Sequence, residues 1–238
     1  MALQPIFAVG DIHGQPDMLR AALDLIDADA DTGAPVVFLG DYVDRGPDSR
    51  AVLDILANGL AEGRPWITLL GNHDRYMRNF LNGSGPQYPE RLGWLHPNIG
   101  GRTTLESYGV DVGDRRTEEA IRRDAMQAVP AAHRAFLDRL RTMHLTEDQI
   151  FAHAGIRPGV PLDQQEEHDL IWIRDPFLMD TRDHGRLVVH GHTPQQGPVH
   201  LGNRLNLDGG AGFGRPLSAA VLRGRDAWLL GKGGRIKL

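Results

Sequence analysis

The stretch VVFLGDYVDRG at residues 36–46 decides the fold. Its apolar run of residues 36–39 stops at a glycine followed by an aspartate, as expected for a buried parallel strand that ends in a polar turn. Residues 6–9 (IFAV) and 66–70 (WITLL) have the same form, and Gly-Asp or Gly-Asn follows each of them. The sequence therefore predicts three parallel strands with functional side chains just beyond their carboxyl ends.

Two helices are predicted between these strands. Apolar residues recur at helical spacing over residues 16–30, and again up to residue 60 after an N-cap at Asp48–Ser49. The first seventy residues thus predict a β-α-β-α-β arrangement, which is typical of an α/β fold.

A change of composition follows this unit. Residues 82–101 are rich in Gly, Pro and Asn, which predicts a long surface connection or lid. Helical patterns resume at 102–108, 117–127 and 130–143. Because residues 82–146 contain few large apolar residues, we interpret them as an insertion within a single domain of residues 1–238.

A second sheet is predicted from the remaining apolar runs. These strand-like runs occupy residues 149–152, 187–190, 204–207, 217–222 and 226–230. We expect this sheet to pack on the first one.

Composition narrows the classes of partner and of metal site. The 238 residues carry a net charge of −5, so we expect neither nucleic acid nor a membrane as a partner. The chain has no cysteine, which excludes disulfides, zinc–thiolate sites and a thiol nucleophile. The first residues show no signal-peptide pattern, and we expect a cytoplasmic protein.

Five polar clusters follow the predicted strands: GDIHG (10–14), GDYVDRG (40–46), GNHD (71–74), HAG (153–155) and HGHT (190–193). Carboxylates, an amide oxygen and imidazoles are the ligands that a pair of divalent metal ions requires. Asp11 and His13 can hold one ion, and Asp41 is the natural bridge to a second. The second ion would also bind Asn72, His153 and His192.

The ordered motifs resemble the phosphoprotein phosphatase (PPP) family of calcineurin-like metallophosphoesterases in its short bacterial and phage form. The resemblance runs from about residue 6 to residue 222. It implies a four-layer αββα fold, with two mixed β-sheets flanked by helices. It also implies a dinuclear metal centre, in which a hydroxide between the metals attacks a phosphomonoester directly.

The resemblance assigns a role to each motif residue. The first metal's ligands are Asp11, His13 and Asp41, and those of the second are Asp41, Asn72, His153 and His192. His73 is the general acid and Asp74 orients it. Arg45 and Arg174 are catalytic and bind the substrate phosphate together with Asn72. The donor set suits two divalent ions, namely manganese with iron or zinc as alternatives.

Three residues have more than one interpretation. His190 lies one glycine from His192 and is interpreted as a supporting residue at the end of a strand, with metal ligation as the alternative. Asp44 is either a partner of a ligand or of Arg45, or an ordinary turn carboxylate. Trp94 either borders the substrate cleft or packs on the core.

The leading hypothesis is a serine/threonine protein phosphatase that acts on phosphoproteins or phosphopeptides. The second aspartate of GDYVDRG favours it over a symmetrical bis(5'-nucleosyl)-tetraphosphatase, which shares the same centre. The tetraphosphatase would need extra groups to hold nucleosides, and the candidates are Arg78, Arg91, Trp94 and Arg102. A third hypothesis, an inactive scaffold that binds metals and phospho-ligands, ranks last because every ligand and the acid are present. The sequence gives no basis for predicting regulatory subunits.

Overall fold

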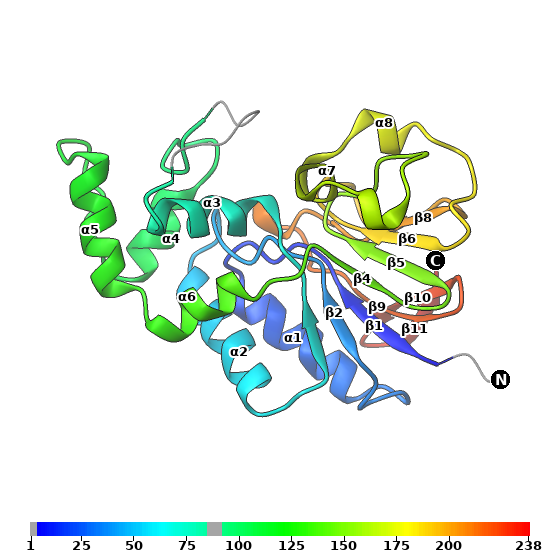
Figure 1. The fold of residues 1–238 in the computed structure, drawn as a ribbon. Helices are drawn as coiled ribbons and strands as arrows, with labels where there is room; N and C mark the ends of the chain where they lie inside the picture. Colours follow the sequence, from blue (N-terminus) through cyan, green and yellow to red (C-terminus); the bar gives the residue numbers. More distant parts are fainter. Residues whose placement is uncertain (1–3, 85–91) are drawn as a thin grey trace.

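A computed structural model describes residues 4–84 and 92–238 of the chain. Two mixed β-sheets pack face to face with helices on their outer sides (Figure 1). Among the described residues, the first sheet has six strands in the order β11-β10-β9-β1-β2-β3. They are β1 (Ile6–Val9), β2 (Val36–Phe38), β3 (Trp66–Thr68), β9 (Ala219–Arg223), β10 (Asp226–Gly231) and β11 (Gly234–Lys237). The strands β1, β2 and β3 run parallel, as the sequence predicts.

The second sheet contains five strands within the described part of the chain, in the order β4-β5-β6-β8-β7. They are β4 (Met143–Leu145), β5 (Gln149–Ala152), β6 (Leu187–His190), β7 (Val199–His200) and β8 (Arg204–Asn206). Strands β5, β6 and β8 are parallel neighbours, and the two edge strands are antiparallel. The fold class expected from the resemblance is confirmed. The assignment of 217–222 and 226–230 to this second sheet is wrong, because β9 pairs with β1 and β10 with β9.

Alternating side chains along each strand separate the layers. In β1, Ile6 and Ala8 pack between the sheets against residues such as Phe151 and Val189 of the second sheet. The intervening residues of β1 point to the other face and join the core beneath the helices. This period of two explains why four apolar residues in a row form a strand that is buried on both faces.

Helices cover the outer faces. On the first sheet lie α1 (Pro16–Asp27) and α2 (Ser49–Ala61), which the sequence predicts. The side chain of Asp48 accepts a hydrogen bond from the Ala51 amide at 2.9 Å, so the predicted N-cap is confirmed. Over the second sheet lie α7 (Glu167–Trp172) and α8 (Asp175–Leu178). Two short 3-10 turns are η1 (Leu162–Gln164) and η2 (Ala211–Phe213), the second of which packs on His13.

Helix α3 (Asn72–Leu81) has no counterpart among the predicted elements. Its first turn consists of buried polar residues, Asn72, His73 and Asp74, which hide the apolar stripe of the helix. Prediction of helices from apolar spacing therefore misses α3, because the first turn of this helix consists of polar site residues.

The segment 82–146 is more firmly packed than a lid. Residues 85–91, which include Arg91, lie outside the described part of the chain. Trp94, Leu95 and Ile99 are buried in the main core. The segment then forms α4 (Gly101–Ser107), α5 (Glu118–Ala128) and α6 (Ala131–Asp138), and it ends in β4, which pairs with β5. Residues 92–100 form turns and bends without a helix or strand, as predicted for a connection, but the burial of Trp94, Leu95 and Ile99 shows that they are not a lid. The second sheet also begins inside the range assigned to the insertion.

None of the helices in the described ranges is long and apolar enough to cross a membrane.

Candidate functional site

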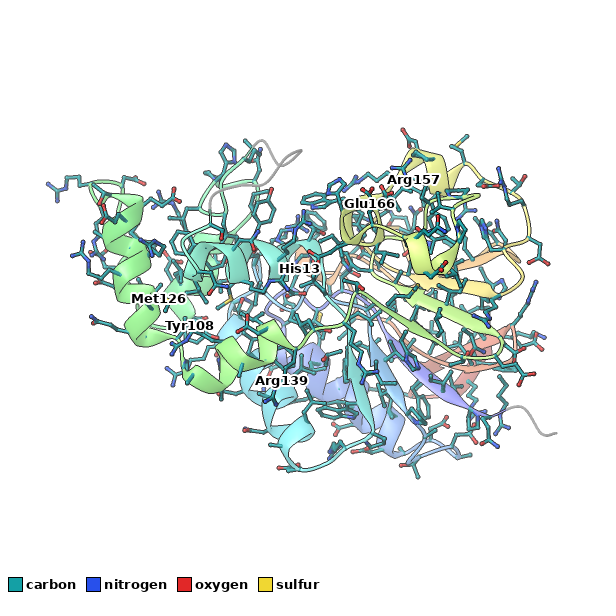
Figure 2. All side chains as sticks on the ribbon, in the orientation of Figure 1. His13, Tyr108, Met126, Arg139, Arg157 and Glu166 are labelled. Atoms are coloured by element: carbon teal, nitrogen blue, oxygen red, sulfur yellow. The ribbon has the colours of Figure 1, made fainter. Side chains whose placement is uncertain are left out.

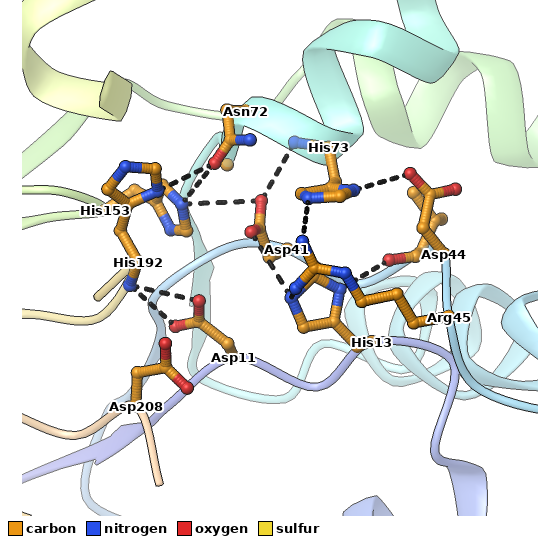
Figure 3. Close-up of polar contacts among 12 residues, drawn as sticks. Asp11, His13, Asp41, Asp44, Arg45, Asn72, His73, His153, His192 and Asp208 are labelled. Carbon is orange, nitrogen blue, oxygen red and sulfur yellow. Dashed lines mark hydrogen bonds and ion pairs between the residues drawn. The ribbon is translucent and has the colours of Figure 1, made fainter. Parts of the chain in front are cut away.

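The ends of five strands and the first turn of α3 meet at one edge of the two sheets. The residues that follow β1, β2, β5, β6 and β8 converge there with the N-terminus of α3 (Figure 3). Figure 2 places His13 at the centre of the molecule, whereas Met126 and Arg157 lie at its periphery. The convergence brings together the predicted ligands, which are Asp11, His13, Asp41, Asn72, His153 and His192, and all six are buried.

Asp41 lies between two groups of imidazoles. One carboxylate oxygen, Oδ1, accepts the His73 amide hydrogen at 2.9 Å and lies 3.4 Å from Nε2 of His153. The other oxygen, Oδ2, lies 3.5 Å from Nε2 of His13. The two oxygens of one carboxylate thus face opposite sides, which is the geometry that the predicted bridging role requires.

The second group of the site gathers around the side-chain oxygen of Asn72. Nε2 of His153 lies 3.0 Å from this oxygen and Nδ1 of His192 lies 2.9 Å from it. The other ring nitrogen of His153, Nδ1, contacts the Leu39 carbonyl at 2.9 Å. That carbonyl requires an N–H on Nδ1, so Nε2 is the nitrogen that points into the site and that a bound ion would use.

On the other side of Asp41, His13 is held in the same way as His153, by a backbone carbonyl at one ring nitrogen. Its Nδ1 lies 2.9 Å from the Val43 carbonyl, which turns Nε2 towards Asp41. Burial, followed by the neighbouring His73, lowers the pKa of His13 to about 3, so the ring is neutral as a metal ligand must be. The Asp11 carboxylate contacts the other side of the site, where it accepts the His192 amide hydrogen at 3.0 and 3.3 Å.

Buried carboxylates give the site an excess of negative charge. Burial raises the pKa of Asp11, and the nearby Asp208 raises it further. Burial also raises the pKa of Asp208 itself. By contrast, although burial opposes it, His153 holds the pKa of Asp41 well below its usual range. A divalent cation among these groups would offset their repulsion and the cost of burying them.

Asp208 is a site residue that the sequence prediction missed. It is buried directly after β8 and lies beside Asp11 in Figure 3. The signal was available, because the predicted strand at 204–207 is followed by Asp-Gly-Gly, as the other site strands are followed by Gly-Asp or Gly-Asn.

Backbone strain gathers at the same place. Within the described ranges, the non-glycine residues with positive φ are His13, Asp41, Asp44, Arg45 and His192, and every one of them lies in the site. Residues other than glycine, asparagine and aspartate adopt this conformation at a cost of about 1 kcal/mol or more, which applies here to His13, Arg45 and His192. The fold therefore maintains this geometry against local preference, which is typical of functional sites.

An arginine lies beside each group of imidazoles. The guanidinium of Arg45 lies 3.1 Å from Nε2 of His13 and 3.1 Å from Nε2 of His73. On the other side, Nε of Arg174 donates to Nε2 of His192 at 3.3 Å. Both arginines named from the sequence thus reach the site.

The contacts of His73 correct the role predicted for Asp74. Nδ1 of His73 lies 2.6 Å from a carboxylate oxygen of Asp44, which is fully buried. The Asp74 carboxylate instead accepts three backbone amide hydrogens, from Gly71, Asp41 and Tyr42, at 2.8 to 2.9 Å. Asp74 therefore fixes the start of α3 against the Asp41 turn, and Asp44 is the residue that orients His73.

His190 lies at the end of β6 and is fully buried. Its Nδ1 faces the Gly191 carbonyl at 3.0 Å, and its ring packs edge-on against Phe177. This placement is that of a residue supporting the strand end.

Two residues of the segment 82–146 hold Asp44 in place. The indole N–H of Trp94 lies 3.0 Å from both carboxylate oxygens, and the Thr104 hydroxyl donates to Oδ1 at 2.7 Å. Trp94 is buried and packs on Phe80, so it does not border a substrate cleft. This segment therefore contributes to the site by orienting the partner of His73.

We expect the Trp94→Phe variant to lower kcat about tenfold, because it removes the N–H and lets Asp44 shift from His73. The free energy of unfolding should fall by about 1–2 kcal/mol with the lost hydrogen bond. Steady-state kinetics with a poor and a good leaving group measure the effect, which should be smaller with the good one. Trp66→Phe is the matched control, because Trp66 packs on Phe38 in the first sheet. Equal losses in the two variants would contradict the role given to Trp94.

The donor atoms of the site fit metal ions. Those of His13, Asp41 and His73 lie within 4.8 Å of one another, and so do those of Asp41, His153 and His192. Both ring nitrogens of His73 already have partners, Asp44 and Arg45, which leaves His13 and Asp41 as the candidate ligands of the first group. Asp41 belongs to both groups, in line with its position between them.

The family model described as calcineurin-like phosphoesterase matches residues 4–224. The chain belongs to the calcineurin-like phosphoesterase family. Members of this family are metal-dependent hydrolases of phosphate esters, and the two groups of donor atoms are where such an enzyme would hold divalent ions.

Three relatives of this phosphoesterase stand out. An asymmetrical bis(5'-nucleosyl)-tetraphosphatase of Anoxybacillus flavithermus is 29% identical over 79% of this chain and 75% of its own. A symmetrical bis(5'-nucleosyl)-tetraphosphatase of Legionella pneumophila is 43% identical over 34% of this chain and 28% of its own. A crystal structure of a putative diadenosine tetraphosphatase, 21% identical, covers 100% of this chain and 98% of its own with a TM-score of 0.67, which shows the shared fold.

These relatives correct two predictions made from the sequence. The serine/threonine protein phosphatase, with phosphoproteins or phosphopeptides as substrates, is wrong, since the curated relatives are named for dinucleoside tetraphosphates. The motif behind the prediction explains the error. The second aspartate of GDYVDRG is Asp44, and it contacts His73 inside the site rather than a group that selects the substrate.

Proposed function

We propose that this phosphoesterase hydrolyses dinucleoside tetraphosphates. The observation that carries the proposal is the similarity to an asymmetrical bis(5'-nucleosyl)-tetraphosphatase along 79% of this chain. The residues of the site support it, because an arginine flanks each of the two groups of donor atoms. Guanidinium groups on two sides suit a chain of phosphates better than a single phosphoryl group.

In this proposal, Asp11, His13 and Asp41 hold one divalent ion, and Asp41, Asn72, His153 and His192 hold the other. Manganese is the proposed metal, because oxygen and imidazole ligands suit it. The bound ions would neutralise phosphate charge and lower the pKa of a water molecule, making it a nucleophile near neutral pH.

The remaining site residues act on the substrate. Arg45 and Arg174 would hold phosphate oxygens through paired N–H groups, and the amide of Asn72 would add to this contact. His73 would give its proton to the departing phosphate oxygen, with the buried Asp44 holding the ring in place. Because Arg45 already lies 3.1 Å from Nε2 of His73, a phosphate held by Arg45 would meet this nitrogen.

The proposal is tested by incubating the manganese-loaded protein with diadenosine tetraphosphate and separating the nucleotides by chromatography. We expect the dinucleotide to be consumed, and consumption to stop when a chelator removes the metal. Two molecules of ADP indicate symmetrical cleavage, and AMP with ATP indicates asymmetrical cleavage. An intact dinucleotide, in a sample that still hydrolyses p-nitrophenyl phosphate, would refute the proposal.

A further inference from the structure

One exposed aromatic ring lies at the edge of the site. Among the large apolar side chains that the described residues expose, Phe213 is the aromatic one, and 62% of its surface is accessible. The guanidinium carbon of Arg45 lies 5.0 Å from the centre of its ring. The same guanidinium contacts His13 and His73, so a single side chain connects the exposed ring to the site.

The turn η2 holds Phe213 at this position. Gly210 and Gly214 flank the turn with φ of 87° and 77°, a conformation that glycine adopts without strain. Between them, Gly212 packs on the His13 ring, where a Cβ would lie 2.7 Å from Cδ2 of the imidazole. The Gln15 side chain donates to the Ala211 carbonyl at 3.3 Å. The turn is thus fixed against a proposed metal ligand while its aromatic residue stays exposed.

A second cation lies two residues beyond the ring. The guanidinium of Arg215 packs beside Gly210, and its Nε is buried without a hydrogen-bond partner. No carboxylate of the described residues forms an ion pair with Arg215. The positive charge of this half-buried side chain is thus available to an anionic ligand beside the turn.

Three of the groups first considered for nucleoside binding lie among the described residues, and these three do not form such a surface. The indole of Trp94 is buried on Asp44, and Arg102 donates to the carbonyls of Leu95 and Val112. Arg78 contacts Glu167 at 3.4 Å. The aromatic ring beside the site comes instead from the turn after β8.

We propose that Phe213, beside Arg45 and on the same turn as Arg215, is the platform on which a nucleobase of the substrate stacks. The proposal rests on the proposed function, and it names the part of this chain that distinguishes a nucleotide from a bare phosphate ester. Arg45 lies over one face of the ring, and the exposed remainder gives a base the flat apolar contact that stacking requires. The guanidinium of Arg45, and that of Arg215 on the same turn, would attract the phosphates attached to that base.

The test compares two ligands that differ only in the base. Titration calorimetry of the manganese-loaded protein measures the dissociation constants of AMP and of ribose 5-phosphate, with a phosphate-release assay to show that both stay intact. We expect AMP to bind about tenfold more tightly, equivalent to about 1.4 kcal/mol of stacking. Phe213→Ala should reduce this ratio to less than about threefold, and Phe213→Trp should preserve it.

Leu201→Ala is the matched control, because Leu201 is a similarly exposed apolar side chain, with 56% accessible, on the turn between β7 and β8. It should leave the ratio as in the unmodified protein. An unchanged ratio in Phe213→Ala would overturn the platform, even if diadenosine tetraphosphate is cleaved. The proposed function is tested separately, because the chromatographic assay shows directly whether diadenosine tetraphosphate is cleaved.

Discussion

The Asp41→Asn variant is expected to lose bound metal and to reduce kcat/KM on the order of a thousandfold or more. Asparagine preserves the shape of the side chain and tolerates the positive φ of 54° at this position. It removes the negative charge that separates His13 on one side from His153 on the other. Two cations would then repel each other without a shared counter-charge.

Mass spectrometry of the metal content and steady-state kinetics on the same preparation measure this effect. Asp17→Asn is the control, because the Asp17 side chain is 96% exposed on α1 and contacts only Arg20 among the described residues. If Asp41→Asn retains two metal ions per chain and near-normal turnover, the bridging role is wrong.

The His73→Asn variant is expected to keep its metals and to lower kcat by about 10²–10⁴-fold. Nε2 of His73 faces Arg45 and its Nδ1 faces Asp44, an arrangement suited to giving up a proton beside a held phosphate. The loss should shrink when the leaving group is p-nitrophenolate, because this group needs little protonation.

His192→Asn is the matching substitution on the other side of the site. Nδ1 of His192 lies 2.9 Å from the Asn72 oxygen, so its replacement should release metal. Measuring metal content in both variants separates the two roles. Metal loss in His73→Asn together with retention in His192→Asn would reverse the assignments.

Much of the fold can be predicted from short stretches of sequence, without knowledge of which residues meet in space. Apolar runs such as residues 6–9 and 187–190 become strands because either face of a central strand meets a core. The strand ends then gather polar motifs at one edge of the sheets, and for this reason the sequence identifies residues such as Asp41 and Asn72 that the structure brings together.

The sequence could not show which side chains meet across the site. Asp74 is adjacent to His73 in the chain, but in the first turn of a helix neighbouring side chains point in different directions. The partner of His73 comes from Asp44, 29 positions earlier, and only the tertiary arrangement shows this. Phe213 was missed for a similar reason, because an aromatic residue in a glycine-rich turn carries no signal of its exposure.

The substrate class was the hardest feature to predict. The metal ligands, the proton donor and the arginines meet needs common to phosphoester hydrolysis, so their motifs distinguish poorly between a phosphopeptide and a dinucleotide. Specificity depends on what lies around the centre, and here that includes the turn carrying Phe213 beside Arg45.

The ratio of kcat/KM for diadenosine tetraphosphate to kcat/KM for a phosphothreonine peptide, on one manganese-loaded preparation, tests the central claim most directly. If dinucleoside tetraphosphates are the substrates, we expect this ratio to be at least about ten, equivalent to about 1.4 kcal/mol of transition-state binding. A ratio that favours the phosphopeptide would contradict it.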